Sequence, residues 1–401
     1  MIPDARQSFN ERFTPAGYER LLDLLAERCG GPVAFRVCET PCFLPGDLLN
    51  RLAADGFDLI RQLTESSDYR LASEAAIPPR WRVPDEPEHP LFVQVDFGLV
   101  RGTAGGLEPR LVEIQGFPSL YAFQPVLAQA YLDAYGLEDS WSLCLGGLDA
   151  GTYRQLLRDA IVGDHDPQQV ILLDVDPGRQ KTRCDFVLTE QLTGIRTVCL
   201  TEVRRRGDRL FYQRDGVETP VRRVYNRCIV DEIERRRIEP PFDYRQALDI
   251  EWAGHPNHYF RISKFSIPYL RHSSVPRTWF VDELPEIPAD LENYVLKPLY
   301  SFAGHGVVVG PERASIDAIP QERRHEFILQ ERVSFERVID TPHGLTQMEI
   351  RLMYIWPDDE LEPRAVCSLL RTGRGQQMGV DHNKNMAWVG ASAALSTSAT
   401  R

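Results

Sequence analysis

The stretch at 294–310, YVLKPLYSFAGHGVVVG, constrains the fold more than any other part of the sequence. An apolar run ends in Lys297 and a proline, a loop of small residues follows, and a second apolar run begins at position 307. This pattern predicts a strand, a loop and a second strand. A lysine that ends a buried strand needs an anionic partner, and Gly304 and Gly306 let several backbone N–H groups approach one negative ligand. The stretch therefore predicts an anion site, and a nucleotide phosphate fits it best.

Lysine is rare in this chain, which makes the lysine positions informative. The sequence has four lysines and forty-two arginines. Two of the four lysines belong to one ordered set of features: Lys264, a Val-Pro pair at 275–276, the strand that ends in Lys297, and the glycine loop. A glycine loop alone is a weak signal of a nucleotide site, and the order of these features strengthens it.

Composition and charge restrict the classes of function. With 401 residues, 43% of them hydrophobic, the chain can bury a large core and form two or three packed units. The formal net charge of −12 argues against a nucleic-acid surface. There is no apolar run of membrane-spanning length, and the polar N-terminus is unlike a signal peptide, so a cytoplasmic protein without a membrane partner is expected. The eight dispersed cysteines predict reduced thiols.

A second set of polar residues lies on two adjacent strands predicted early in the chain. The strand at 91–98 contains Asp96, and the strand at 110–115 contains Glu113 and Gln115. Two carboxylates and an amide oxygen form a set of oxygen ligands that suits magnesium. A solvated strand face is an equally simple interpretation of the same residues.

Alternation along the second strand places Glu113 and Gln115 on one face, with Val112 and Ile114 packed on the other. The next residues, GFPSLY at 116–121, are unlike an exposed hairpin tip and favour a site.

The middle of the chain predicts a small, mainly parallel sheet. Buried strands at 170–175 and 197–201 alternate with a helix at 181–192. The sequence DVDPG at 174–178 ends the first strand, at the edge where such sheets bind ligands, although an ordinary βα turn has the same pattern. A further helix is expected at 242–252.

The last part of the chain predicts two strands, 348–356 and 364–370, that form a hairpin. Glu349 and Arg351 share one face of the first strand, and Arg371 follows the second. The glycine-rich segment at 372–379 leads to a group typical of a polar active-site loop: Asp381, His382, Asn383 and Asn385. Residues 392–401 are expected to form a frayed tail.

Together, these residues resemble the ATP-grasp superfamily. The points of resemblance are Lys264, the Val-Pro pair at 275–276, the strand and lysine at 295–298, the loop at 301–306, the strand at 329–333, Arg351 and Arg371. In most members the metal-binding acidic residues come last, whereas here Asp96 and the Glu113-Ile-Gln115 triplet come first. This order is similar to that of circularly permuted members such as glutathionylspermidine synthetase. Gln115 stands where asparagine is usual.

The resemblance implies a mixed α/β (α+β) chain with a circularly permuted ATP-grasp fold and a small pre-ATP-grasp domain built on the parallel sheet. It divides the chain into an N-terminal mixed region at 1–90, magnesium-binding strands and helices at 91–165, the pre-ATP-grasp domain at 166–250, a nucleotide lid lobe at 251–335, and the remaining core strands and C-terminal tail at 336–401.

The resemblance also implies that ATP and Mg²⁺ bind between two lobes. The residues that would bind the nucleotide are Lys264, Lys297, Ser301, Gly304, His305, Gly306, Gln330, Glu331 and Val333. The residues that would hold magnesium are Asp96, Glu113 and Gln115. Arg351 and Arg371 would be catalytic, because they would neutralise charge on the transferred phosphoryl group and on the acyl phosphate.

The implied activity is ATP-dependent ligation of a carboxylate to an amine through an acyl phosphate, with release of ADP and phosphate. The substrates would be small molecules such as an amino acid or a small peptide, and a homo-oligomer is compatible with the sequence. Two alternatives stay open. One is an ATP-binding protein of the same fold without ligase activity, acting as a sensor or partner, which the Gln115 departure would allow. The other is an ATP-grasp phosphotransferase.

Overall fold

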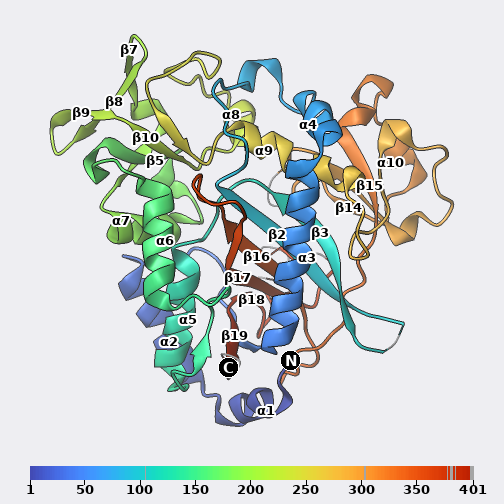
Figure 1. The fold of residues 1–401 in the computed structure, drawn as a ribbon. Coiled ribbons are helices and arrows are strands. Elements are labelled where there is room, and N and C mark those ends of the chain that lie inside the picture. The colour runs from blue at the N-terminus through green and yellow to red at the C-terminus, as the bar shows by residue number, and fades with distance from the viewer. Residues whose placement is uncertain (104, 302–303, 377, 380–382, 384, 398–401) are drawn as a thin grey trace.

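The computed structural model describes residues 1–103, 105–301, 304–376, 378–379, 383 and 385–397, and it shows a mixed α/β architecture (Figure 1). At its centre is a five-stranded antiparallel sheet in the order β18-β17-β16-β2-β3. The strands are β2 (Phe92–Arg101), β3 (Leu107–Gln115), β16 (Gln347–Ile355), β17 (Arg364–Gly373) and β18 (Gly390–Ser392). The two predicted hairpins are therefore confirmed. They pair with each other through β2 and β16, although they come from opposite parts of the chain.

Helices cover both faces of the central sheet. Helix α3 (Gly46–Glu65) lies against β2 and β16, as Figure 1 shows, and buries apolar residues at helical spacing. Helix α5 (Phe123–Tyr135) packs against β17, and α2 (Pro15–Arg28) packs against α5. The strand β16 is buried along its whole length, although it includes the polar residues Gln347, Glu349 and Arg351.

The predicted parallel sheet is present, in the order β11-β10-β5-β6. Its strands are β5 (Val170–Asp174), β6 (Arg196–Cys199), β10 (Arg223–Asn226) and β11 (Glu251–Ala253). Helix α6 (Ala150–Val162) precedes β5, and helix α7 (Arg183–Thr193) connects β5 to β6. The helix expected at 242–252 is wrong. The backbone at 251–253 instead pairs in parallel with β10, so a distant partner overrides the local pattern.

A smaller antiparallel sheet contains the predicted strand, loop and strand at 294–310. Its order is β12-β15-β13-β14. The strands are β12 (Thr278–Phe280), β13 (Tyr294–Pro298), β14 (Val308–Val309) and β15 (Phe327–Glu331). Helix α10 (Arg313–Asp317) lies between β14 and β15 in the sequence. Apolar side chains such as Leu296, Ile316 and Leu329 form a separate small core under this sheet.

Two three-stranded sheets complete the β structure. One contains β7 (Arg204–Arg206), β8 (Arg209–Arg214) and β9 (Val217–Val221). The other contains β1 (Cys42–Phe43), β19 (Ala394–Thr397) and β4 (Trp141–Ser142). The frayed tail expected at 392–401 is therefore wrong for residues 392–397, since β18 pairs with β17 and β19 pairs with β1 and β4. Residues 398–401 lie outside the described part.

The remaining α-helices are α1 (Pro3–Arg12), α4 (Ser67–Glu74), α8 (Val230–Arg235) and α9 (Asn257–Arg261). The 3₁₀ helices are η1 (Pro79–Trp81), η2 (Pro167–Gln169), η3 (Pro177–Arg179), η4 (Leu200–Glu202), η5 (Lys264–Tyr269), η6 (Val281–Glu283), η7 (Leu291–Asn293) and η8 (Gln321–Glu326). Each helix among the described residues is too short or too polar to span a lipid bilayer. The eight cysteines are free thiols, as expected.

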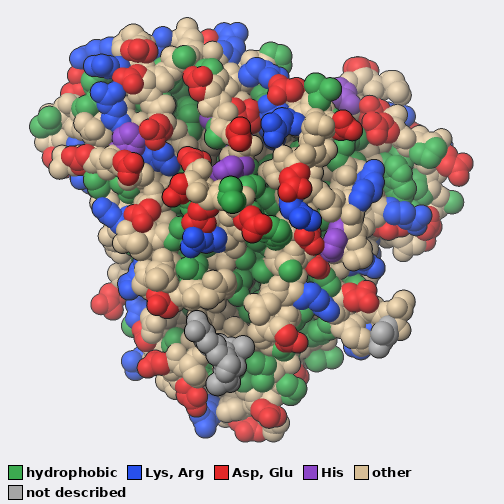
Figure 2. Space-filling view, viewed as in Figure 1, with side chains coloured by type: hydrophobic (Ala, Val, Ile, Leu, Met, Phe, Trp, Pro, Cys, Tyr) green, Lys and Arg blue, Asp and Glu red, His purple; other side chains and the backbone are tan. Residues whose placement is uncertain are grey.

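Charged side chains of both signs are intermixed on the face shown in Figure 2. The chain contains 46 lysines and arginines against 58 acidic residues, so acidic groups outnumber basic ones. The interior of the fold holds a more specific arrangement of charge.

Candidate active site

A cavity of about 350 Å³ is lined by residues from both the central sheet and the β12-β15-β13-β14 sheet. It contains three of the four lysines of the chain, Lys181, Lys264 and Lys297, and the fourth, Lys384, lies outside the described residues. Apolar side chains also line it: Phe35, Val295, Val307, Val309, Val333, Phe335, Leu369 and Met378. A cavity with an apolar wall and several cationic groups suits a ligand with a ring and an anionic tail.

A β-bulge orients the β3 residues that face this cavity. Asp96 pairs with Glu113 and Phe97 pairs with Leu111, which leaves Val112 as an inserted residue. As a result Val112 and Glu113 both line the cavity. The expectation that Val112 packs with Ile114 on the opposite face is wrong, because the inserted residue breaks the alternation on which it rests.

Lys297, at the end of β13, is buried and reaches across to β3. Its Nζ donates to the carbonyl oxygen of Val112 at 2.9 Å and to Oε1 of Gln330 at 2.5 Å. Burial lowers the pKa of Lys297 to about 8, although the carboxylate of Glu113 acts to raise it. Part of the Lys297 population is therefore uncharged just above neutral pH, and a bound anion would favour the protonated form.

Lys264, the first residue of η5, pairs with the acidic hairpin. Its Nζ lies 3.1 Å from Oε1 of Glu113 and donates to the carbonyl oxygen of Ser301 at 2.8 Å. Burial acts to raise the pKa of Glu113, but Lys264 and Lys297 outweigh it and lower that pKa to about 2. The Glu113 side chain keeps 29% exposure, so water weakens part of this attraction. The structure thus joins the early hairpin to both lysines of the later segment.

Asp96 is enclosed by two arginines. The exposed fraction of Asp96 is 1%, and its Oδ1 accepts a hydrogen bond from Nε of Arg351 at 2.6 Å. Its Oδ2 accepts from Nη2 of Arg351 at 2.7 Å and from Nη2 of Arg371 at 2.6 Å. Short, charge-assisted contacts of this kind hold all three side chains in fixed positions.

Arg371 also forms an ion pair with Glu349 on the neighbouring strand. Burial raises the pKa of Glu349, although Arg371 acts to lower it. Burial acts to lower the pKa of Arg371, but Glu349 and Asp96 more than reverse this and raise it. Among the described residues, Nε of Arg371 has no hydrogen-bond partner, and neither has Nε2 of Gln330. Two buried donors at one cavity point to a ligand that supplies acceptors.

Most residues predicted to bind the nucleotide reach the cavity: Lys264, Lys297, Ser301, Gly304, Gln330, Glu331 and Val333. Glu113, Gln115, Arg351 and Arg371 also line it, and Asp96 lies behind Arg351. His305 and Gly306 are not among its lining residues. The carboxylate of Glu331 also pairs with Arg277. Asp381 and His382, in the predicted polar loop, lie outside the described residues.

Sequence reasoning missed three contributors. Lys181 and Thr182 come from the loop between β5 and α7, and Gln94 precedes Asp96 by two positions on β2. The rarity of lysine was an available signal for Lys181, and strand alternation was one for Gln94. The predicted substrate rim at 174–178 lies earlier in the same loop that supplies Lys181.

The carboxyl group of Asp174, which ends β5, is buried near Arg227. Burial raises the pKa of Asp174 to about 7, although Arg227 acts to lower it. The backbone N–H of Val175 donates to its Oδ1 at 2.6 Å. This hydrogen bond stabilises the backbone where β5 ends and the loop toward Lys181 begins.

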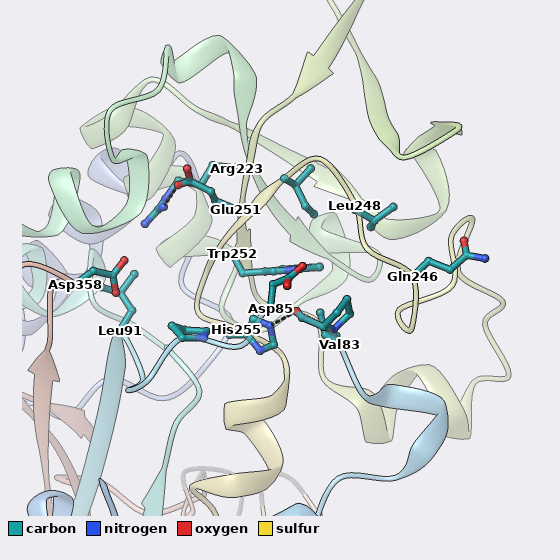
Figure 3. Close-up of a pocket in the computed structure, with 13 residues that line it drawn as sticks. Val83, Asp85, Leu91, Arg223, Gln246, Leu248, Glu251, Trp252, His255 and Asp358 are labelled. Carbon is teal, nitrogen blue, oxygen red and sulfur yellow. Dashed lines mark hydrogen bonds and ion pairs between the residues drawn. The ribbon is translucent and has the colours of Figure 1, made fainter. Parts of the chain in front are cut away.

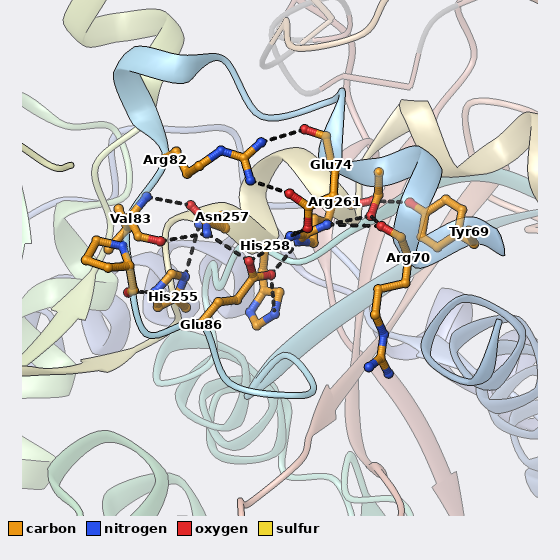
Figure 4. A network of polar contacts seen from close by, with 12 residues as sticks. Tyr69, Arg70, Glu74, Arg82, Val83, Glu86, His255, Asn257, His258 and Arg261 are labelled. Atoms are coloured by element: carbon orange, nitrogen blue, oxygen red, sulfur yellow. Dashed lines mark hydrogen bonds and ion pairs between the residues drawn. The ribbon is translucent and has the colours of Figure 1, made fainter. Parts of the chain in front are cut away.

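A polar network fixes the segment that carries Lys264 (Figure 4). Arg261, the last residue of α9, donates to Glu86 through Nε at 2.5 Å and Nη2 at 2.9 Å, and to Glu74 at 2.5 Å. Asn257, the first residue of α9, donates from Nδ2 to Glu86 at 2.8 Å. Residues of the first ninety positions therefore hold α9, which leads directly into η5.

A second cavity of about 260 Å³ lies beside β11 (Figure 3). Two of its charged residues pair with each other, since Nη1 of Arg223 lies 2.6 Å from Oε2 of Glu251, and Nε2 of His255 contacts the carbonyl oxygen of Pro84 at 3.2 Å. The residues predicted to bind a nucleotide line the larger cavity and not this one.

Comparison with known proteins adds a similarity of fold. No protein-family model and no curated protein matches the sequence. Among solved structures, a glutathione synthetase-like effector from Globodera pallida, in its apo form, is similar with a TM-score of 0.56. The match covers 96% of this chain and 98% of that chain at 10% sequence identity. The similarity therefore extends over nearly the whole of both chains, and at this identity it concerns the fold alone.

Proposed function

We propose that the cavity binds ATP and that the protein is an ATP-dependent ligase that joins a carboxylate to an amine. The observation that carries this proposal is the convergence of Lys264 and Lys297 with the acidic hairpin at one cavity. The fold similarity to a glutathione synthetase-like protein supports it, and it favours an amino acid or a small peptide as substrate. The circularly permuted ATP-grasp arrangement and its five segments belong to the same proposal.

ATP fits the residues that are present. The unpartnered donors on Arg371 and Gln330 could meet phosphate oxygens, as could the ammonium groups of Lys264 and Lys297. Val295, among the other apolar residues of the wall, offers a surface for an adenine ring.

Magnesium does not fit the expected ligand set in its present arrangement. Asp96 is paired with two arginines, Glu113 is paired with Lys264, and Gln115 lies against Arg351. Among the described residues there is no group of three His, Cys, Asp or Glu side chains placed to hold a metal ion. Compensation of the triphosphate charge is therefore assigned to side chains of the protein.

In the proposed reaction, a substrate carboxylate attacks the γ-phosphorus of ATP and ADP leaves. The amine then attacks the acyl phosphate, and phosphate leaves as the amide forms. Lys264, Lys297 and Arg371 stabilise negative charge on the phosphoryl group as it moves. Bound nucleotide and substrate would fill the cavity and limit the access of water to the acyl phosphate.

A second candidate is a nucleotide-binding protein without ligase activity. The pairing of Asp96 with Arg351 and Arg371 favours it, because the carboxylate expected to hold a metal is already neutralised. Nucleotide binding without ADP release across a broad substrate panel would support this candidate.

The test measures ADP release from ATP with a panel of amino acids and small peptides as carboxylate and amine donors. We expect substrate-dependent ADP release, an acyl phosphate that hydroxylamine traps, and a loss of at least about a hundredfold in turnover for Lys297→Ala. Arg313→Ala is the matched control, because Arg313 lies in the same lobe with an exposed side chain. Unchanged turnover in Lys297→Ala would place the active site elsewhere, and a stable phosphorylated product would indicate a phosphotransferase.

A further inference from the structure

We infer that ATP binding in this cavity does not require a divalent cation, because the guanidinium of Arg351 holds two of the three residues expected to bind magnesium. The inference rests on the proposed ATP site and specifies the form of the nucleotide, the free polyphosphate anion, that the site accepts.

The first observation is the saturation of Asp96. Both carboxylate oxygens accept hydrogen bonds from Arg351, at 2.6 and 2.7 Å, and Oδ2 accepts a further one from Arg371 at 2.6 Å. Asp96 is 1% exposed, so a metal ion could reach its oxygens only by displacing a guanidinium. Arg351 lies on β16, which pairs directly with β2, so the contact is part of the sheet itself.

The second observation is the position of Gln115. In one orientation of its amide, Nε2 of Gln115 donates to Oε1 of Gln94 at 2.7 Å; in the rotated orientation, the amide oxygen accepts from Arg351 at 2.8 Å and 2.9 Å. In the rotated form two N–H groups of the Arg351 guanidinium meet an acceptor, whereas the unrotated amide sets its own N–H groups against them. These two charge-assisted contacts outweigh the single hydrogen bond to Gln94 that the rotation gives up. The amide oxygen expected to bind magnesium therefore accepts hydrogen bonds from an arginine.

The third observation is the balance of charge around the cavity. Six cationic side chains line the cavity: Lys181, Lys264, Lys297, Arg332, Arg351 and Arg371. They stand against four anionic ones, Glu113, Glu331 and Glu349 in the lining and Asp96 behind Arg351. A divalent cation placed among these guanidinium and ammonium groups would meet strong repulsion in a buried site. A polyphosphate anion is attracted by the same groups without a metal.

Isothermal titration calorimetry of wild-type protein with ATP tests the inference directly, once with excess magnesium chloride and once with excess EDTA. We expect dissociation constants that agree within about threefold, since protein cations supply the compensation. Weakening by about tenfold or more in EDTA would overturn this inference and leave the proposed ATP site standing. Absence of binding in both buffers would overturn the inference together with the proposed function.

The variant Arg351→Met adds a second readout, because it frees Asp96 and Gln115. We expect ATP binding in EDTA to weaken by at least about tenfold, and magnesium to restore part of it. Equal affinity of Arg351→Met and wild type in EDTA would overturn the inference. Arg313→Met, altered at an exposed arginine, serves as control. If Arg351→Met fails to fold, the comparison of the two buffers with wild-type protein still decides the matter.

Discussion

At the scale of one residue, the proposed ATP site would make the protonation of Lys297 part of ligand binding. Its pKa of about 8 in the free protein comes mainly from burial. A bound phosphate stabilises the protonated amine, so binding draws on the fraction of protein in which Lys297 carries a proton. That fraction is large below pH 8 and falls as the pH rises above it.

We therefore expect the affinity for ATP to fall by about tenfold between pH 7 and pH 9, as Lys297 loses its proton. Titration calorimetry across this range measures the effect. The variant Lys297→Met should bind weakly at every pH and show a flat profile over the same range. A flat profile in the wild-type protein would contradict the assigned role of Lys297.

The sequence predicts which residues belong to the candidate site where a residue type is rare enough to be informative. A chain with four lysines draws attention to Lys264 and Lys297, and both line the cavity. The orientation of Val112 was not readable, because the bulge in β3 arises from pairing with β2 and leaves no mark in a pattern of alternation.

Close packing between β3 and α9 sets the site at the scale of elements. The backbone N–H of Gly116, which follows β3, donates to the carbonyl oxygen of Ile262 at 2.7 Å. A Cβ atom at position 116 would lie 2.7 Å from the carbonyl oxygen of His258 and 3.2 Å from Cβ of Ile262. Glycine at this position lets η5 bring Lys264 to Glu113.

We expect Gly116→Ala to lower the free energy of unfolding by about 1–3 kcal/mol, as overpacking does elsewhere, and to weaken ATP binding because Lys264 moves away from Glu113. Urea unfolding and titration calorimetry measure the two effects. Gly106→Ala is the matched control, because an added Cβ there, in the turn of the same hairpin, meets no atom within 4 Å. Equal behaviour of the two variants would show that the close approach at Gly116 does not position Lys264.

Element type was predictable where the local pattern and the packing agree. Helix α2 begins after Thr14, whose side chain accepts from the N–H of Gly17, and β5 reads as a buried strand. The strands β11 and β19 could not be recognised, because each is only three or four residues long and depends on pairing with a distant partner.

One buried ion pair connects the layers at the scale of the whole molecule. Asp185 of α7 is fully buried and accepts from Nη1 of Arg227 at 2.7 Å, next to the parallel sheet. The same carboxylate accepts from the backbone N–H groups of Leu120, Ala122 and Phe123 at 3.0–3.1 Å, where α5 begins. Asp185 therefore joins the parallel sheet to the helix that covers the central sheet.

We expect Asp185→Ala to lower the free energy of unfolding by about 3–5 kcal/mol, because it leaves a buried arginine without its partner. Urea unfolding measures the loss. Asp243→Ala, which removes a surface pair with Arg245, should leave that free energy nearly unchanged. A small effect in Asp185→Ala would show that the layers hold together without this contact.

The pairing of β2 with β16 has a consequence for the newly made chain. Asp96 emerges from the ribosome long before Arg351 and Arg371, the side chains that enclose it. Until β16 and β17 have been made, β2 and β3 lack their neighbours in the central sheet, and Asp96 lacks the arginines that pair with it. The proposed nucleotide site is therefore complete only after Arg371 has been made, so a chain that stops before this residue would lack the site proposed for ATP.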